Sequence, residues 1–340
     1  MKAAVLESRG ELAVRDFPEP DRAGWAVVET RAAGVCGTEL HIIDALFEPP
    51  GYPFVIGHEA SGVVVAVPEN SAGSLGQRVA VYNMIGCGRC TWCRTGNAQI
   101  CTDPTGQLGF TLHGTFSDLI AVPVENLVPL PDEVSFEEAA LLSCAGMTAV
   151  HAVRLAGVCL GETVVVDGVG GVGLMVIQVA KAAGARVLAI ADSAEKAALA
   201  EGVGAFASVV LSSEGYEPVA TQVRELTDGA GSDHFFELVG TSASMVAGLR
   251  ALARRGTFVS IGYTSDELKI HPVELILSET RIVSSVAASK RDLEAAVQLA
   301  ADGRIQTVID TRYPLEDVQV ALDRLRSRQV KGRNVLKWSA

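Results

Sequence analysis

The stretch from Gly161 to Asp192, GETVVVDGVGGVGLMVIQVAKAAGARVLAIAD, constrains the fold of this chain more than any other. It opens with an apolar, β-branched run at Thr163–Val166, which is typical of a buried parallel strand. A glycine-rich turn follows, then a helical stretch over about 171–184 and a second strand at Arg186–Ala191. Strand, glycine turn, helix and strand in this order predict a Rossmann βαβ unit within a doubly wound parallel sheet.

The glycines of that turn have the spacing G-x-G-x-x-G. Glycine permits a tight turn and lets the backbone approach a pyrophosphate at the N-terminus of the following helix. The residues predicted to bind a cofactor here are Gly168, Gly170, Gly171, Val172 and Gly173. Asp192 follows the second strand, where an acid accepts hydrogen bonds from an adenosine ribose. The segment therefore predicts a nucleotide-binding domain.

A second constraint is the sequence GCGRCTWCRTGNAQIC at residues 86–101, the cysteine lobe, which carries four of the seven cysteines. The array C-x2-C-x2-C-x7-C consists of Cys87, Cys90, Cys93 and Cys101. Four thiolates complete a tetrahedral zinc shell and leave no open position, so such a site is structural. An iron–sulfur cluster or a redox-active thiol set is the alternative, although the bacterial ferredoxin run ends in C-x3-C-P. The spacing favours structural zinc.

Three further motifs carry metal-ligand side chains. Cys36 lies in GVCGTELH, His58 in GHEASG and Cys144 in LLSCAGMTAVHAV. A Cys, His, Cys set with an open fourth position is one of the known catalytic zinc arrangements. Each residue alone is more typical of packing. The set becomes a candidate catalytic site because the chain also carries a nucleotide-binding segment.

The composition limits the expected partners and location. The chain has 28 basic and 40 acidic residues and shows no basic stripe with interleaved aromatics, so no nucleic acid partner is expected. The N-terminus is charged where a signal peptide needs an apolar run, and the longest uncharged apolar stretches, such as 139–153, fall short of a membrane span of about 18 residues. We expect a cytoplasmic protein without a membrane partner, in which clustered cysteines bind metal.

These motifs in this order resemble the zinc-dependent medium-chain dehydrogenase/reductase family, the alcohol dehydrogenases, from MKAAVLE to GRNVLKW. The resemblance implies a GroES-like, β-rich catalytic domain interrupted by a Rossmann domain, with substrate between the two. We predict residues 1–145 and 287–340 as the catalytic domain and 146–286 as the NAD(P)-binding domain. Family members pair strands such as 281–289 across a dimer, which implies a homodimer or homotetramer.

The resemblance also assigns the metal site residue by residue. Cys36, His58 and Cys144 match the catalytic zinc ligands, which together with the cysteine lobe implies two zinc ions per chain. Glu59 matches an acid that approaches the metal during ligand exchange, and Glu39 one that orients the ligand histidine. The sorbitol and threonine dehydrogenases resemble CGTELH too but usually carry Glu as third ligand, so Cys144 favours the alcohol dehydrogenases.

The implied reaction transfers a hydride between an alcohol, or its aldehyde or ketone, and a nicotinamide cofactor. Thr38 matches the hydroxyl that hydrogen-bonds the alcohol, and His41 the outer end of a proton relay. Arg333, in KGRNVL, matches a basic residue that reaches the cofactor's phosphates. The loop at 42–55 carries few charges, which favours an uncharged or modestly polar alcohol over a phosphorylated one.

The cofactor and the reaction both have alternatives. The ribose-binding acid usually stands at the position of Ala191, and here Asp192 comes one residue later. Its charge should repel a 2′-phosphate although Lys196 offsets it, so NAD is favoured with NADP possible. A zinc-retaining reductase of an activated C=C bond or a specialised carbonyl is the alternative enzyme. A non-enzymatic nucleotide-binding protein would be expected to lose Thr38, His41 or a zinc ligand.

Overall fold

The computed structural model describes residues 1–20, 23–69, 71 and 73–338. The chain forms two compact units. The first comprises Met1–Met147, Ser289–Gly303 and Thr307–Ala340, and the second comprises Thr148–Ala288 and Arg304–Gln306. The two main boundaries each fall two residues after the ones expected from the sequence.

One short segment differs from the expected division, because residues 304–306 belong to the second unit rather than to the C-terminal return. The side chain of Gln178 holds this segment, donating to Gln306 O and accepting from Gln306 N, each at 2.9 Å. Arg304 also donates to Ala182 O at 2.7 Å. These are contacts between residues more than a hundred positions apart, which local sequence does not encode.

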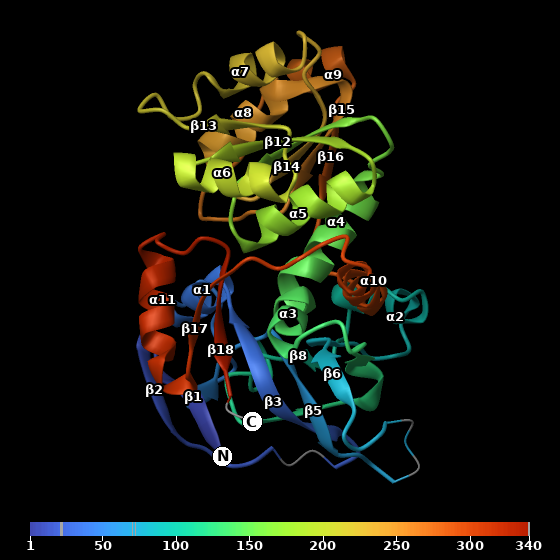
Figure 1. Ribbon diagram of the computed structural model, residues 1–340, viewed down its shortest axis with the longest axis vertical. Coiled ribbons are helices and arrows are strands. Elements are labelled where there is room, and N and C mark those ends of the chain that lie inside the picture. The colour runs from blue at the N-terminus through green and yellow to red at the C-terminus, as the bar shows by residue number, and fades with distance from the viewer. Residues whose placement is uncertain (21–22, 70, 72, 339–340) are drawn as a thin grey trace. The chain divides into compact units, whose positions relative to one another are not determined.

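The first unit is built mainly of strands (Figure 1). The strands of its larger sheet are β3 (Ala26–Val35), β5 (Ala60–Ala66), β6 (Arg78–Val81), β9 (Leu119–Val122), β10 (Leu127–Pro129), β17 (Ile309–Tyr313) and β18 (Arg333–Lys337). Their order is β10-β6-β5-β3-β18-β17, with β9 also paired to β3. Strand β18 runs antiparallel to β3 with Asn334 opposite Val35. The C-terminal strand therefore lies beside the residues that lead into Cys36.

Smaller sheets and helices complete this unit. The remaining strands are β1 (Lys2–Ser8), β2 (Glu11–Asp16), β4 (Phe54–Val55), β7 (Met84–Ile85) and β8 (Gly106–Gln107), in the orders β2-β1-β4 and β7-β8. The helices are α1 (Gly37–Ile43), α2 (Thr91–Arg94), α3 (Phe136–Leu141), α10 (Lys290–Ala301) and α11 (Val318–Arg326), with 3₁₀ turns η1 (Ala98–Ile100), η2 (Val124–Asn126) and η4 (Leu315–Asp317).

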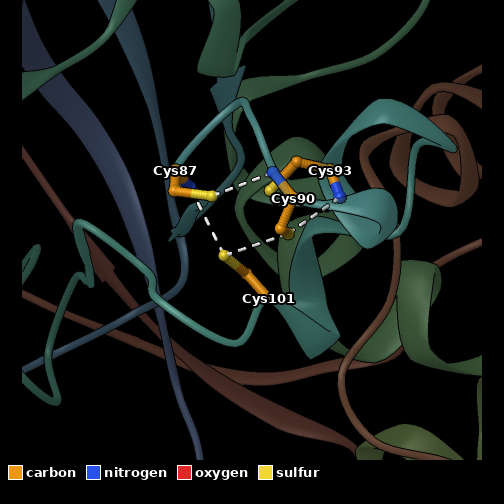
Figure 2. A group of neighbouring side chains, drawn as sticks. All are labelled: Cys87, Cys90, Cys93 and Cys101. Atoms are coloured by element: carbon orange, nitrogen blue, oxygen red, sulfur yellow. Dashed lines mark hydrogen bonds between the residues drawn. The ribbon is translucent and has the colours of Figure 1, made fainter.

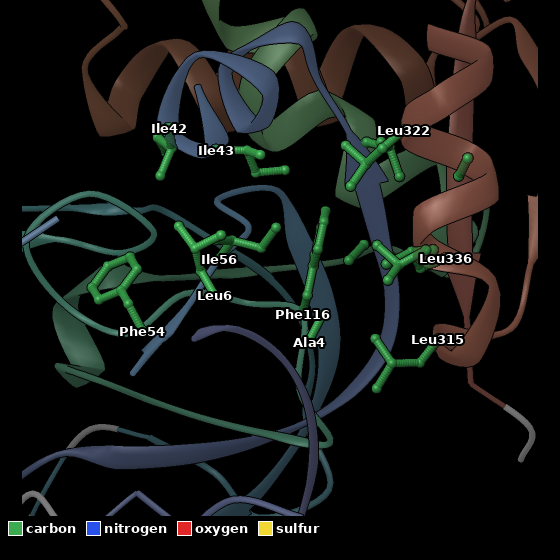
Figure 3. Packing of buried hydrophobic residues seen from close by; sticks show 14 residues of the cluster. Ala4, Leu6, Ile42, Ile43, Phe54, Ile56, Phe116, Leu315, Leu322 and Leu336 are labelled. Atoms are coloured by element: carbon green, nitrogen blue, oxygen red, sulfur yellow. The ribbon is translucent and has the colours of Figure 1, made fainter. Parts of the chain in front are cut away.

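The core of the first unit brings together distant segments (Figure 3). Strands β1 and β18, helices α1 and α11 and the segment around Phe116 contribute buried apolar side chains. Ten of these are Ala4, Leu6, Ile42, Ile43, Phe54, Ile56, Phe116, Leu315, Leu322 and Leu336. Burial of this apolar surface holds both ends of the chain on one unit.

A continuous helical run covers Phe136–Ala156: α3, then a π-helical turn (Leu142–Gly146), then α4 (Met147–Ala156). At 21 residues and a mean hydropathy of 1.4, this helix is long and apolar enough to cross a membrane. The uncharged run at 139–153 is shorter than a membrane span, as expected, but the helix extends beyond it through Glu137, Glu138 and Arg154. However, 72% of its apolar window is buried within the protein. Its apolar character follows from that burial.

The second unit contains a six-stranded parallel sheet. Its strands are β11 (Thr163–Asp167), β12 (Arg186–Ala191), β13 (Ala207–Val210), β14 (Ser232–Glu237), β15 (Leu252–Ser260) and β16 (Arg281–Ser284). The order β13-β12-β11-β14-β15-β16 is that of a Rossmann fold. The helices are α5 (Gly171–Ala182), α6 (Ala194–Val203), α7 (Val219–Leu226), α8 (Ser242–Ala251) and α9 (Pro272–Ser278). The predicted doubly wound sheet is confirmed.

The last strand is shorter than expected, because β16 ends at Ser284 and does not continue to residue 289. Its partner β15 ends at Ser260, which pairs with Ser284. Beyond that point Ala287 has a φ of 47°, a left-handed conformation that ends an extended strand. Ser289 then accepts from Asp292 N as the N-cap of α10.

Candidate active site

A buried cluster in the first unit gathers the three predicted catalytic zinc ligands. One ligand atom from each of Cys36, His58, Glu59 and Cys144 lies within 4.8 Å of the others. His58 Nε2 is 3.3 Å from Cys144 Sγ, close to the separation of about 3.6 Å that tetrahedral zinc imposes on a nitrogen and a sulfur ligand. The structure therefore brings together side chains that are more than a hundred residues apart in the sequence.

The position of Cys144 depends on the π-helical turn between α3 and α4. Such turns add one residue to a helix and often occur at functional sites. Ser143, in the same turn, accepts a hydrogen bond from Ala60 N at 3.1 Å, and Ala60 begins β5 directly after Glu59. The turn is thereby attached to the start of the strand that directly follows His58 and Glu59. The sequence contains no signal for this distortion.

Glu39 connects two of the candidate ligands. Its Oε2 accepts from the backbone N of Cys36 at 2.8 Å, which caps helix α1, and its Oε1 lies 2.6 Å from His58 Nδ1. With Nδ1 held by Glu39, His58 Nε2 faces the cluster, as a metal-ligand histidine requires. Asn83, which sequence reasoning missed, donates to His58 O at 3.1 Å. A lone Asn after β6 gives no pattern that would identify it.

Glu59 lies fully buried beside Arg333. Its Oε1 is 3.3 Å from Arg333 Nη2 and 3.9 Å from His58 Nε2. Burial raises the pKa of Glu59 to about 7, against the opposing charge of Arg333. A Cβ on Gly34 would lie 1.9 Å from Glu59 Oε2, so glycine is required there. Glu59 therefore lies among the candidate zinc ligands and next to the buried charge of Arg333.

Arg333 is buried beside the candidate zinc ligands, an environment that the sequence did not suggest. Arg333 is 6% exposed, and besides Glu59 its side chain contacts Val35 O, which lies 3.4 Å from Nη1. It is therefore a buried cation of the metal cluster, brought there because β18 pairs with β3. Its predicted contact with cofactor phosphates stays a prediction.

The chemistry of this cluster fits a zinc ion. A hydrogen bond from Cys144 lowers the pKa of Cys36 well below its ordinary range, and the charges of Arg333 and His58 favour the thiolate against burial. Thiolate is the form that binds metal. Two cysteines and one histidine would hold zinc and leave its fourth position open.

Thr38 and His41 both lie on helix α1, three residues apart and so on neighbouring positions of one face. Thr38 Oγ1 is 3.6 Å from Cys36 Sγ, next to the metal cluster. His41 is half-buried one turn further along the helix. Of the two residues predicted for proton transfer, Thr38 therefore lies beside the cluster and His41 lies one helical turn farther along α1.

Aromatic side chains extend from the cluster toward His41. The ring of Phe110 is 5.7 Å from that of His58, Phe47 is 6.1 Å from Phe110, and His41 is 6.4 Å from Phe47. Phe47 is 39% exposed. This aromatic row forms an apolar wall beside the candidate catalytic metal.

The cysteine lobe forms the second candidate metal centre (Figure 2). Its four sulfur atoms all lie within 4.8 Å of one another, and Cys90 Sγ is 3.7 Å from Cys101 Sγ. Tetrahedral zinc with four thiolates requires about 3.8 Å. The backbone N of Cys93 donates to Cys90 Sγ and lowers the pKa of Cys90 to about 6. A Cβ on Gly86 would lie 2.5 Å from Cys93 Sγ, so the lobe needs glycine there.

The glycine-rich turn of the second unit has the geometry of a dinucleotide site. Gly168 has a φ of 106°, and helix α5 begins at Gly171 with Gly170 as N-cap and Val172 in its first turn. A Cβ on Gly173 would lie 1.9 Å from Gly168 O, so only glycine lets the helix pack on the turn. The helix N-terminus is thus open to a pyrophosphate.

The two residues expected to distinguish the cofactors contact each other. Asp192 follows the buried Ala191 at the end of β12 and is half-exposed. Lys196, one turn into α6, lies 2.8 Å from Asp192 Oδ2. The lysine charge is therefore neutralised by the acid beside it.

Comparison with known proteins agrees with both units. Residues 22–132 match the alcohol dehydrogenase GroES-like domain and residues 171–302 the zinc-binding dehydrogenase domain. An alcohol dehydrogenase of Geobacillus stearothermophilus is 32% identical, with 99% of each chain covered. An NAD-dependent alcohol dehydrogenase of Sulfurisphaera tokodaii is 31% identical, again with 99% of each covered.

The crystal structure of AibC superposes with a TM-score of 0.92 at 34% identity, covering 100% of this chain and 96% of the other. The domain matches and the NAD-dependent relative support a zinc site and a nicotinamide cofactor, and the domain matches confirm the predicted pairing of GroES-like and Rossmann folds. The chain belongs to the zinc-dependent medium-chain dehydrogenase/reductase family.

Proposed function

We propose that this protein is a zinc-dependent alcohol dehydrogenase that transfers a hydride between an alcohol, or its aldehyde or ketone, and NAD. The observation that carries the proposal is the buried cluster of Cys36, His58 and Cys144, which offers three ligands and an open position. It occurs in a chain whose other unit carries a dinucleotide-binding turn.

The reaction divides between the two units. Cys36, His58 and Cys144 would hold a zinc ion, which would supply a Lewis acid for the substrate oxygen. Thr38 accepts the alcohol proton, and His41 passes a proton on to solvent. Glu39 orients His58 by its 2.6 Å contact with Nδ1. The glycine-rich turn holds the cofactor's pyrophosphate.

The aromatic row restricts the class of substrate that fits beside the candidate metal site. Phe110 lies beside His58 of the metal cluster and Phe47 lies beside Phe110, and both offer apolar surface. An uncharged alcohol with an apolar substituent fits such a wall better than a phosphorylated one, because burying a charge without a partner is costly.

The deciding experiment measures zinc per chain and, in the same preparation, the oxidation of primary, secondary and polyol alcohols with NAD and NADP. About two zinc ions with NAD-dependent oxidation of apolar alcohols support the proposal. Two zinc ions with turnover only of an activated alkene or a specialised carbonyl would instead identify the biosynthetic reductase. Absence of turnover in every assay would contradict both enzymes.

NAD is favoured because the charge of Asp192 would repel a 2′-phosphate and because Asp192 already pairs with Lys196. Asp192→Asn should remove the repulsion and release Lys196, so we expect the ratio of kcat/KM for NADP to that for NAD to rise about tenfold or more. Steady-state kinetics with both cofactors measure this ratio. The double variant Asp192→Asn, Lys196→Ala is the matched control and should lose most of the gain. An unchanged ratio in Asp192→Asn would rule out this role.

A homodimer through the edge of the parallel sheet is the expected assembly. Strand β16 ends the strand order, and exposed apolar side chains surround it: Val273, Ile276, Leu277, Ile282 and Val286. Ile276 and Leu277, 69% and 71% exposed, lie on helix α9 next to the sheet. A second copy that covers them would bury a surface that is otherwise costly in water.

The double variant Ile276→Glu, Leu277→Glu should therefore be a monomer. Light scattering after size-exclusion chromatography would report the mass. Val320→Glu, which changes another exposed apolar residue, on α11, is the control and should keep the wild-type mass. An unchanged mass of the double variant would place the interface elsewhere.

A further inference from the structure

Two buried carboxyl groups stand side by side at the carboxyl edge of the parallel sheet. Asp167 is the last residue of β11 and Glu237 the last of β14, and the two are paired in the register of these neighbouring strands. Residues paired in parallel strands point to the same face of the sheet. Asp167 is 1% exposed and Glu237 is fully buried.

The hydrogen bonds of these carboxyl groups leave one oxygen of each unsatisfied. Glu237 Oε1 accepts from Val239 N, Gly240 N and Ser244 Oγ at 2.7 to 3.0 Å. Asp167 Oδ1 accepts from Tyr216 Oη at 3.0 Å. Asp167 Oδ2 and Glu237 Oε2 have no hydrogen-bond partner within the described part of the chain. Two adjacent buried anions would be costly, whereas one proton between them satisfies both oxygens.

Asp167 is the better site for that proton. Three donors converge on Glu237, as suits a carboxylate, but only one reaches Asp167. Burial and the neighbouring Glu237 raise the pKa of Asp167 to about 8, against the hydrogen bond from Tyr216. Besides Asp167 and Glu237, the negative charge of Asp192 also acts on Tyr216. The surroundings therefore favour a neutral Asp167 near pH 7.

The pair joins two loops at the sheet edge. Asp167 directly precedes Gly168 of the glycine-rich turn, and its carbonyl accepts from Leu238 N at 3.1 Å. Glu237 holds the backbone of Val239 and Gly240. A bond between the two side chains thus ties the turn after β11 to the turn after β14.

We propose that Asp167 and Glu237 share one proton, with Asp167 Oδ2 donating to Glu237 Oε2, and that this bond positions the glycine-rich turn for the dinucleotide. Loss of the proton to solvent leaves two carboxylates that repel each other beneath the pyrophosphate site. The second half of the proposal rests on the proposed use of NAD. The first half concerns the second unit alone.

The first test compares the thermal midpoints of the wild type and Asp167→Asn, as full chains without cofactor, from about pH 5 to pH 9.5. Asn keeps the shape, accepts from Tyr216 and donates to Glu237. A carboxyl whose pKa is raised in the folded state loses its stabilising contribution as pH rises from about 4 to about 8, and above that no further change follows. Asn does not titrate, so its advantage should grow over this range to roughly 5 °C or more and then stay constant.

The control is Asp228→Asn, which removes an exposed acid of the same unit and should follow the wild-type pH dependence. A wild type and Asp167→Asn that differ by the same amount at every pH would overturn the shared proton. So would an Asp167→Asn that is less stable at pH 8.5, because that result identifies Asp167 as an ionised acceptor.

The second test measures NADH affinity by fluorescence at pH 7 and pH 9. The wild type should lose about fivefold more affinity than Asp167→Asn over this interval. Equal losses would overturn the positioning role. If NADH binds neither protein at either pH, the proposed function fails, whereas the thermal midpoints still decide whether the proton is shared.

Discussion

Replacing Cys36 by alanine should lower kcat/KM for alcohol oxidation by at least about 10³-fold, because polarisation of the substrate oxygen by a metal is worth several kcal/mol. The variant should also lose about one zinc per chain, since His58 and Cys144 alone complete only part of a tetrahedral shell. The cysteine lobe uses other residues and should keep its metal. Metal analysis and steady-state kinetics on the same preparation measure both effects.

The matched control is Cys159→Ala. Cys159 is an exposed thiol that lies outside both metal clusters of the described structure, so its removal should change neither the zinc content nor kcat/KM. A Cys36→Ala variant that keeps wild-type zinc and activity would show that the buried cluster is not the catalytic site. That result would leave the proposed zinc site of the cysteine lobe unaffected, because the lobe uses other residues.

Replacing Cys101 by serine should have a different result: the thermal midpoint should fall strongly, whereas the turnover rate should change less. The lobe contains one four-residue helix, α2, none of whose residues is buried. A segment without an apolar core depends on its metal to hold a single conformation. We expect the thermal midpoint to fall by about 10 °C or more, because loss of a structural metal is among the largest effects of a point substitution.

Thermal unfolding, zinc content and limited proteolysis within residues 86–101 together test this expectation. Cys101→Ser should lose about one zinc and be cleaved in the lobe, while the remaining zinc supports turnover at low temperature. Cys159→Ser provides the control for a cysteine-to-serine change and should unfold like the wild type. An unchanged midpoint with an uncleaved lobe would mean that the four cysteines do not hold a structural metal.

Local patterns in the sequence were sufficient for the βαβ unit and the cysteine lobe. The strands Thr163–Asp167 and Arg186–Ala191 and the helix between them lie where the periodicity and the glycines predict them. The four lobe cysteines are within fifteen residues, so their spacing alone limits how they can meet. Short-range geometry is encoded directly in neighbouring residues.

The candidate catalytic cluster could not be predicted from the spacing of its residues alone. The three ligands were named through the family resemblance, and the contact of Glu39 with His58 agrees with the role that it implied. The buried position of Arg333 was not foreseen, because it depends on the pairing of β18 with β3. Asn83 and the π-helical turn at Cys144 were also missed, since neither has a pattern in the sequence.

The sequence by itself indicated the candidate residues for the chemistry, namely two sets of possible metal ligands and a dinucleotide-binding turn, and it indicated the family. Tertiary structure alone decided the environment of these residues. It buried Glu59 against Arg333, held residues 304–306 on the second unit and left Asp167 and Glu237 each with one unsatisfied oxygen. The physical reason is that burial, charge and hydrogen bonding depend on neighbours brought together by strand pairing and packing, often from more than a hundred residues away.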